Sequence, residues 1–231
     1  MLVPLPRVRR PVVAAAAALL CVGLLVGCSG EDDAATDPEA VGAEPQSMTT
    51  CAYPEDGSKA PEGIDAPSEE APDTGDVAAV MTTNAGDIDL TLDREATPCT
   101  VNSFVSLAEQ GYFDGTQCHR ITTQGIFVLQ CGDPTATGMG GPGYKFADEL
   151  TGDETYPAGT LAMANAGPDT NGSQFFIVYD DTQLDPNYAV FGHVGAAGLK
   201  VVQGIAAKGA ADGAPDGPPA EQVDIEKVTI G

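Results

Sequence analysis

The chain has 231 residues and a formal net charge of −24 at pH 7, because 34 acidic residues stand against only 10 lysines and arginines. Proteins that bind nucleic acids or anionic membrane surfaces use basic patches, so neither is expected as a partner of so acidic a chain. The sequence also lacks the glycine motifs of Walker loops and of dinucleotide-binding folds.

The first 27 residues have the pattern of a secretory signal peptide. Three arginines within residues 7–10 precede an apolar run over residues 11–26, which is too short to favour a transmembrane helix. The run ends in LVGC (25–28), which resembles a bacterial lipobox, where the cysteine becomes the first mature residue and carries a lipid. An ordinary signal or anchor with an incidental cysteine is the alternative. We expect a protein at the extracytoplasmic face of the cell membrane, held there only by a lipid on Cys28.

Residues 28–76 are predicted to be a disordered tether. Six prolines occur among acidic, alanine, glycine and hydroxyl residues, and Lys59 is the only basic residue. Such a segment cannot bury enough apolar surface to offset the entropy lost when its backbone is ordered. Local docking of the stretch CAYP (51–54) onto the following domain is an open alternative.

Four cysteines follow Cys28, and they favour structural disulfides or buried thiols. Disulfides are permitted outside the cytoplasmic membrane, and four cysteines allow three pairings, among which the sequence does not choose. No CxxC unit occurs, so a zinc site or a thioredoxin-like redox pair is not favoured. The four are Cys51, Cys99, Cys118 and Cys131.

Residues 77–231 are long enough for one domain with a sizeable core, and their pattern is mainly β. Apolar alternation predicts an opening hairpin over 77–83 and 88–92. Pro98, with Thr97 as the cap, begins a helix that ends at Gly111. Further elements are strands over 117–121, 126–130, 188–194 and 223–230 and a helix over 198–206. Many short strands with two helices favour a closed β-barrel capped at its ends.

The domain shows no pattern for nucleophilic or metal-dependent catalysis. Cys118 and His119 are neighbours on a predicted strand, so their side chains point to opposite faces and cannot act as a pair. Two histidines, His119 and His193, with scattered carboxylates make no metal-ligand pattern, and HExxH is missing. We therefore expect neither a bound metal nor a cofactor.

Arg120 is conspicuous because it is one of only two arginines after the signal segment. A structural ion pair is the simple interpretation in an acidic domain, but the surrounding motifs favour another. They are CHRITTQGIFVLQCGD (118–133), TGMGGPGYKFADE (137–149), LAMANAGPDTNGSQFFI (161–177) and AVFGHV (189–194). Together these motifs resemble the cyclophilin-type peptidyl-prolyl isomerases, over nearly the whole domain from Val77 onward.

The resemblance implies a fold and a reaction. The fold is a mainly β, closed eight-stranded antiparallel β-barrel capped by two α-helices, in agreement with the pattern above. The reaction is rotation about X-Pro bonds, which amide resonance opposes with a barrier of about 18–20 kcal/mol. A cationic donor near the prolyl nitrogen and preorganised hydrogen bonds are sufficient, without a cofactor. The expected partners are proline-containing, unfolded or flexible polypeptides that are secreted or lie in the envelope, and the protein itself is expected to be a monomer.

The resemblance also implies the site residues. Arg120 is the cationic donor, with Phe127 and Gln174 as further catalytic residues. The proline socket comprises Phe127, Val128, Phe176 and Leu184, and Gln130 and Gln174 bind the peptide and orient Arg120. Other substrate contacts are His119, Ala164, Asn165, Ala166, Gln183 and Tyr188. Independently of the family, strand alternation requires that Phe175 and Phe176 face opposite sides, so at most one of them lines the pocket.

The sequence departs from the family at the rim of this site. Gln183 stands where many eukaryotic members have tryptophan, Tyr188 stands where they often have histidine, and the bend over 122–126 carries an extra residue. Strong cyclosporin binding is therefore not expected, whereas isomerase activity is. The alternatives are a proline-peptide binding module with little turnover and, with less support, a redox-linked chaperone that uses the four cysteines.

Overall fold

The computed structural model describes residues 46–231, which belong to one compact unit. The predicted signal peptide, the lipidation site Cys28 and the first part of the predicted tether lie outside the described residues. Within 46–231, no helix has the length and apolarity needed to cross a membrane. In the same range, no group of three or more His, Cys, Asp or Glu side chains is placed to hold a metal ion.

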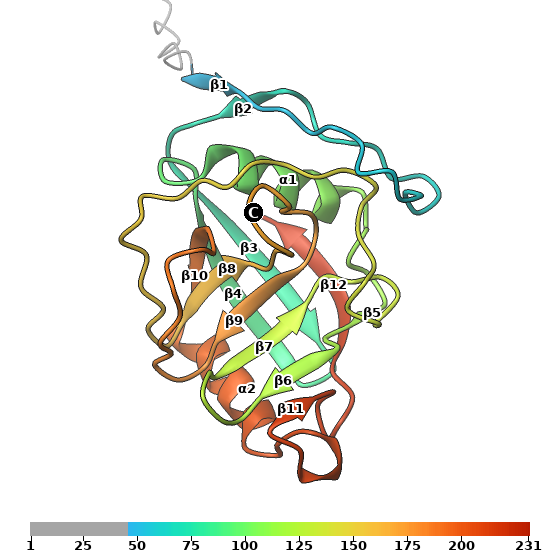
Figure 1. Ribbon diagram of the computed structural model, residues 1–231, viewed down its shortest axis with the longest axis vertical. Coiled ribbons are helices and arrows are strands. Elements are labelled where there is room, and N and C mark those ends of the chain that lie inside the picture. The colour runs from blue at the N-terminus through green and yellow to red at the C-terminus, as the bar shows by residue number, and fades with distance from the viewer. Residues whose placement is uncertain (1–45) are drawn as a thin grey trace, which may run out of the picture. The chain divides into compact units, whose positions relative to one another are not determined.

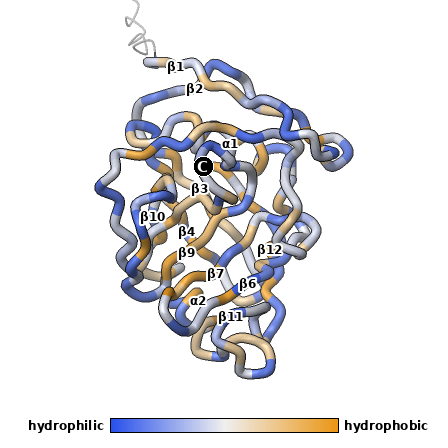
Figure 2. Tube along the Cα trace, in the orientation of Figure 1, coloured by the Kyte–Doolittle hydropathy of each residue, from blue (hydrophilic) through white to orange (hydrophobic). Residues whose placement is uncertain are grey.

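One antiparallel sheet curls into a barrel (Figure 1), and Figure 2 shows apolar residues along its strands. The order of its strands in the sheet is β11-β6-β7-β9-β8-β10-β4-β3-β12-β5. In chain order the strands are β3 (Asp76–Thr83), β4 (Gly86–Asp93), β5 (Thr116–Gln117), β6 (Arg120–Thr122), β7 (Val128–Cys131), β8 (Thr160–Met163), β9 (Phe175–Val178), β10 (Val190–Val194), β11 (Asp216–Gly217) and β12 (Asp224–Ile230).

The sheet has ten strands where eight were predicted. The stretch from β5 to β6 is a single passage of the chain that is interrupted at Cys118 and His119. β5 pairs with β12 and β6 pairs with β7, so the two sides of the barrel meet in this one passage. The Cys118 N–H donates to Val223 O (2.9 Å) and the His119 N–H to Gln130 O (3.1 Å), which continues both seams. The other additional strand is β11, two residues long and paired with β6.

The opening hairpin is confirmed. β3 and β4 pair in unbroken register from Asp76 opposite Asp93 to Thr83 opposite Gly86. Buried and more exposed residues alternate along both strands, as expected when one face of a hairpin lines a core. The turn needs glycine because Gly86 has a φ of +130°, which residues with a Cβ rarely adopt.

Two helices cover opposite ends of the barrel, α1 (Pro98–Glu109) and α2 (Ala196–Ala206), and a 3-10 turn, η1, spans Ala211–Gly213. α1 inserts Phe104, whose ring packs against Phe113, Phe175 and Phe191 with centroids 5.1–5.5 Å away. Thr97 lies at the helix start but makes no capping bond with its side chain. The Glu149 carboxylate takes that role, accepting from the N–H groups of Cys99 (2.9 Å) and Thr100 (2.8 Å).

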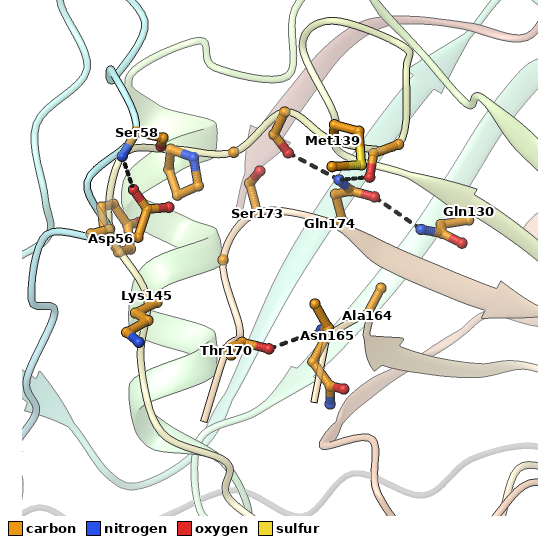
Figure 3. Close-up of a pocket in the computed structure, with 17 residues that line it drawn as sticks. Asp56, Ser58, Gln130, Met139, Lys145, Ala164, Asn165, Thr170, Ser173 and Gln174 are labelled. Carbon is orange, nitrogen blue, oxygen red and sulfur yellow. Dashed lines mark hydrogen bonds between the residues drawn. The ribbon is translucent and has the colours of Figure 1, made fainter. Parts of the chain in front are cut away.

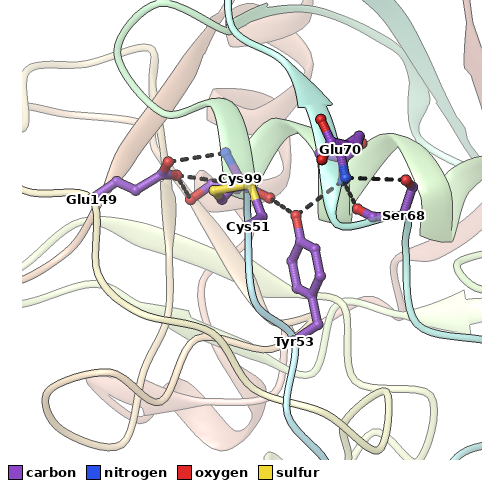
Figure 4. Close-up of a disulfide and its surroundings, with 8 residues drawn as sticks. Cys51, Tyr53, Ser68, Glu70, Cys99 and Glu149 are labelled. Atoms are coloured by element: carbon purple, nitrogen blue, oxygen red, sulfur yellow. Dashed lines mark hydrogen bonds between the residues drawn. A yellow bond between two sulfur atoms is a disulfide. The ribbon is translucent and has the colours of Figure 1, made fainter. Parts of the chain in front are cut away.

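Residues 46–76 form an ordered arm that lies over α1 (Figure 1), so the prediction of a disordered tether is wrong for this part of 28–76. β1 (Met48–Thr50) pairs with β2 (Glu70–Pro72). Just after β1, a disulfide joins Cys51 to Cys99, and the buried Tyr53 donates its hydroxyl to Cys99 O at 2.8 Å (Figure 4). The composition argument failed because it counted only the arm's own apolar surface, whereas a covalent bond and the surface of α1 hold the arm.

The second disulfide joins Cys118 to Cys131, which decides between the three pairings left open. Cys118 lies between β5 and β6, and Cys131 is the last residue of β7. This bond therefore crosses the β6–β7 seam beside Arg120 and Gln130, which are directly opposite each other in that pair of strands.

Candidate active site

Arg120 extends from β6 and has a carboxylate partner that the sequence did not indicate. Its Nε and Nη2 atoms donate to the two oxygens of Asp216, each at 2.7 Å, and its Nη1 donates to Gln130 Oε1 at 3.1 Å. The hydrogen bonds to Asp216 raise the pKa of the Arg120 guanidinium, and the same bonds lower the pKa of the Asp216 carboxyl group. The Arg120 side chain remains 36% exposed, so it is accessible to a ligand.

Two glutamine amides extend this network away from Arg120. Gln130 Nε2 donates to Gln174 Oε1 (2.9 Å), and Gln174 Nε2 donates to the carbonyl oxygens of Gly138 (3.1 Å) and Gly140 (2.9 Å), as Figure 3 shows. In each amide the oxygen accepts from one partner and the nitrogen donates to another. A 180° flip of either amide would therefore break hydrogen bonds. The network therefore fixes the carbonyl that faces Arg120.

The loop that accepts these bonds is organised by Asp133, which is fully buried. Its carboxylate accepts from the N–H groups of Thr135 (2.7 Å), Thr137 (3.0 Å) and Gly138 (2.6 Å). A side-chain Cβ at Gly140 would come within 2.0 Å of that carboxylate, so glycine is required there. Sequence reasoning missed Asp133, although an Asp followed by Thr and Gly residues is a turn signal that could have identified it.

A small apolar pocket of about 100 Å³ lies beside the guanidinium. Phe176 and Tyr188 meet edge to face at 5.5 Å on one wall, and Val128 and Ile126 of the β7 side form another. The apolar residues that line it belong to a hydrophobic cluster separate from the one in the barrel interior. The complete lining is Arg120, Ile126, Val128, Gln130, Ala164, Asn165, Phe176, Leu184 and Tyr188.

Phe127 does not line this pocket, which corrects the socket implied by the family resemblance. Its ring packs against Tyr179 (5.9 Å) and the main core, and Ile126 lines the pocket instead. The reason is alternation: Gln130, Val128 and Ile126 lie on one side of the chain, so Phe127 points to the other.

The same alternation acts on the next strand, β9. Phe175 is fully buried against Phe104 and Phe113 in the barrel interior, while Phe176 lies in the small pocket. Gln174, two residues before Phe176, lies on the same side and joins the amide network. One strand thus supplies an apolar wall and a polar anchor to the same face.

A larger pocket of about 370 Å³ shares Gln130, Ala164 and Asn165 with the small one (Figure 3). It also takes in Gln174 and Ala166. The Ala164 N–H already donates to Gln174 O (2.9 Å) and the Ala166 N–H to Thr170 Oγ1 (2.8 Å), so for these two residues the carbonyl groups remain for pairing with a bound peptide. The two pockets are therefore neighbours that meet at Gln130, Ala164 and Asn165.

Besides Phe127, two further predicted contacts lie outside both pockets. Gln183 is exposed on the segment that leads to Leu184. His119 lies behind the loop at Gly138, and neither of its ring nitrogens has a hydrogen-bond partner among the described residues. Burial lowers the pKa of the His119 imidazole, which keeps it neutral near pH 7.

Comparison with known proteins assigns this architecture to a protein family. A family model described as "Cyclophilin type peptidyl-prolyl cis-trans isomerase/CLD" matches residues 78–230. This chain belongs to the cyclophilin family. The cyclophilin is 49% identical over 195 residues to a probable peptidyl-prolyl cis-trans isomerase B of Mycobacterium leprae, an alignment that covers 78% of this chain and 66% of the relative. The chain thus spans slightly less than two thirds of that relative's length.

Solved structures agree with the family assignment. A cyclophilin-type peptidyl-prolyl cis-trans isomerase of Cryptosporidium parvum superimposes with a TM-score of 0.61 at 31% identity, over 68% of this chain and 98% of the other. A second structure of the C. parvum protein, in the presence of the dipeptide Ala-Pro, gives a TM-score of 0.58 at 32% identity, over 67% and 98% of the two chains. The mainly β fold with two helices is therefore that of the cyclophilins.

Proposed function

We propose that this cyclophilin is a peptidyl-prolyl cis-trans isomerase that acts on X-Pro bonds of flexible polypeptides. The observation that carries the proposal is the position of the Arg120 guanidinium, which forms one wall of a small apolar pocket beside a longer groove. The C. parvum protein was solved in the presence of an Ala-Pro dipeptide, and the apolar pocket here has the chemistry to receive a proline ring.

The groups on the two sides of the pocket suit rotation about a prolyl amide. With the ring between Phe176 and Leu184, the prolyl nitrogen lies toward the guanidinium side. A cationic N–H donor there stabilises the nitrogen lone pair once it leaves amide resonance, so it favours the twisted transition state over either planar isomer. The amide network around Gln130 and Gln174 holds the site in place before the substrate arrives. No covalent intermediate is needed.

The test is an isomerisation assay without protease, in which exchange of an Ala-Pro peptide is followed by NMR. Arg120→Ala should lower kcat/KM by about 10²-fold, as for loss of one preorganised donor to a transition state. Arg120→Lys should recover only part of this, because an ammonium cannot keep the paired bonds to Asp216.

Arg94→Ala is the matched control, because it removes the other arginine of the domain, which lines neither pocket. The isomerase proposal fails if the protein does not accelerate exchange, or if Arg120→Ala turns over as fast as Arg94→Ala. Binding of the peptide without acceleration would support the alternative of a binding module.

We further propose that the protein works at the extracytoplasmic face of the membrane, anchored by a lipid on Cys28. The lipobox-like stretch LVGC (25–28) supports this location. Two disulfides suit the same oxidising environment. Cys51, Cys118 and Cys131 are at most 4% exposed, which shields both bonds from thiol attack and favours a structural role over that of a redox-linked chaperone.

A further inference from the structure

Asp216 lies outside every motif that indicated the site, yet the fold holds it firmly beside Arg120. It belongs to β11, which pairs with β6 so that Asp216 is opposite Thr122 and Gly217 is opposite Ile121. The Thr123 N–H also donates to Pro215 O at 2.8 Å. The strand that carries Arg120 is therefore paired with the strand that carries its partner carboxylate, as the adjacent β6 and β11 in Figure 1 show.

The hydrogen bonds of Arg120 leave a defined set of free donors. A guanidinium has five N–H groups. Asp216 takes the Nε–H and one Nη2–H, and Gln130 takes one Nη1–H. Among the described residues, this leaves one N–H on Nη1 and one on Nη2 without a partner. Because the guanidinium is planar, two parallel bonds to one carboxylate also restrain its rotation about the Cδ–Nε bond, so the free N–H groups keep one direction.

Exposure limits what this ion pair adds to folding stability. The side chains are 36% and 51% exposed, and exposed ion pairs typically contribute about 0–1 kcal/mol, with paired arginine–carboxylate geometry as the favourable case. The geometry instead suits the control of direction, because the carboxylate holds the guanidinium by Nε and Nη2 and leaves one N–H on each of Nη1 and Nη2 free.

We propose that Asp216 is a positioning residue for isomerisation, which locks the Arg120 guanidinium so that its two free N–H groups face the prolyl amide in the small pocket. The inference rests on the proposed function of Arg120 and adds a residue that touches no substrate. Its effect belongs to the transition state, because a freely rotating guanidinium still borders the pocket but no longer presents its donors in a fixed direction.

The test compares three variants in the Ala-Pro exchange assay. Asp216→Ala should lower kcat about tenfold while KM changes less than about twofold, since small misplacements of a catalytic group have effects of this order or larger. Asp216→Asn keeps the shape of the side chain and one acceptor oxygen, so its kcat should lie between that of the parent protein and that of Asp216→Ala. Glu221→Ala is the matched control: it removes a carboxylate from the same connection between α2 and β12, one that pairs with Lys208 instead of Arg120, and kcat should not change.

Two further readouts separate positioning from a general loss of structure. Asp216→Ala should have no additional effect in an Arg120→Ala background, because its role passes through that side chain. The ¹⁵N NMR signal of the Arg120 Nε–H should be sharp and protected from exchange in the parent protein and lost in Asp216→Ala.

An unchanged or raised kcat in Asp216→Ala, an equal loss in Glu221→Ala, or an additive loss in the Arg120→Ala background would each overturn the inference. A normal rate in Arg120→Ala alone would refute the proposed function instead, and the Nε–H signal would still report whether Asp216 immobilises the guanidinium. The two failures are thus distinguishable.

Discussion

Two phenylalanines near the site, Phe176 in β9 and Phe127 just before β7, face opposite ways. Phe176 is 5% exposed and lines the small pocket together with Tyr188 and Leu184. Phe127 precedes β7 and packs with Tyr179 on the other side of the chain. Both would be counted as members of the socket by sequence similarity, so their substitution separates the contribution of the pocket from that of the core.

Phe176→Ala should weaken binding of an Ala-Pro peptide and raise KM by about tenfold or more, because most of one apolar wall is lost. Phe127→Ala should leave KM within about twofold and lower the free energy of unfolding by about 2–3 kcal/mol, less than a fully buried phenylalanine because it is partly exposed. Peptide titration and urea denaturation measure the two effects. A larger KM change in Phe127→Ala than in Phe176→Ala would contradict the assignment.

At this scale, the physical rule of alternation was more reliable than the resemblance. Alternation predicted that Phe175 and Phe176 face opposite sides of their strand. Counted back from Gln130, alternation also places Ile126 and not Phe127 on the side of the small pocket. Asp216 could not be predicted, because it lies 96 positions after Arg120 in the sequence and its strand has only two residues. A strand so short has no periodicity to detect.

At the scale of elements, the arm over 46–76 is the main departure from expectation. It is held by the Cys51–Cys99 bond, by β1–β2 pairing and by Asn102, which donates to Tyr53 Oη (3.0 Å) and to Ser68 O (2.8 Å). None of these partners lines the small pocket. The arm and the small pocket should therefore be separable by mutation.

Removal of the Cys51–Cys99 bond by the double change Cys51→Ser and Cys99→Ser should lower the free energy of unfolding by about 2–4 kcal/mol, since the bond closes a loop with a sequence separation of 48 residues. Turnover of a short Ala-Pro peptide should stay within about twofold. Denaturant unfolding and the exchange assay measure the two quantities. The corresponding pair Cys118→Ser and Cys131→Ser provides the comparison, because that bond adjoins Arg120 and Gln130 and its loss should lower turnover. A large loss of turnover in the first pair alone would contradict this separation.

Other element-scale details depended on tertiary contacts. The hairpin β3–β4 was predictable because its alternation extends over two strands of eight residues each. The cap of α1 was not, because Glu149 comes from 50 residues further along the chain. The break between β5 and β6 was not predictable either, because it depends on pairing in the folded barrel. β5 pairs with β12, whereas β6 pairs with β7.

At the scale of the whole molecule, the acidic composition and the location are connected. A charge of −24 gives no attraction to an anionic membrane surface, so residence at a membrane would require a covalent anchor. The lipid that we propose on Cys28 would be that anchor. The location proposed above therefore depends on one side chain.

Cys28→Ser should move the protein from the membrane fraction to the soluble fraction or stall its processing, because serine has no thiol to accept the lipid. Cys21→Ser is the matched control, since Cys21 lies within the predicted signal peptide and its loss should leave membrane fractionation unchanged. Ultracentrifugal fractionation of cells expressing each variant, followed by immunoblotting, measures the distribution. Where the soluble variant is recovered, its exchange rate on an Ala-Pro peptide should equal that of the parent, because the groups that form the pocket all lie within residues 120–188. Unchanged membrane fractionation of Cys28→Ser would contradict the lipoprotein proposal without affecting the isomerase proposal.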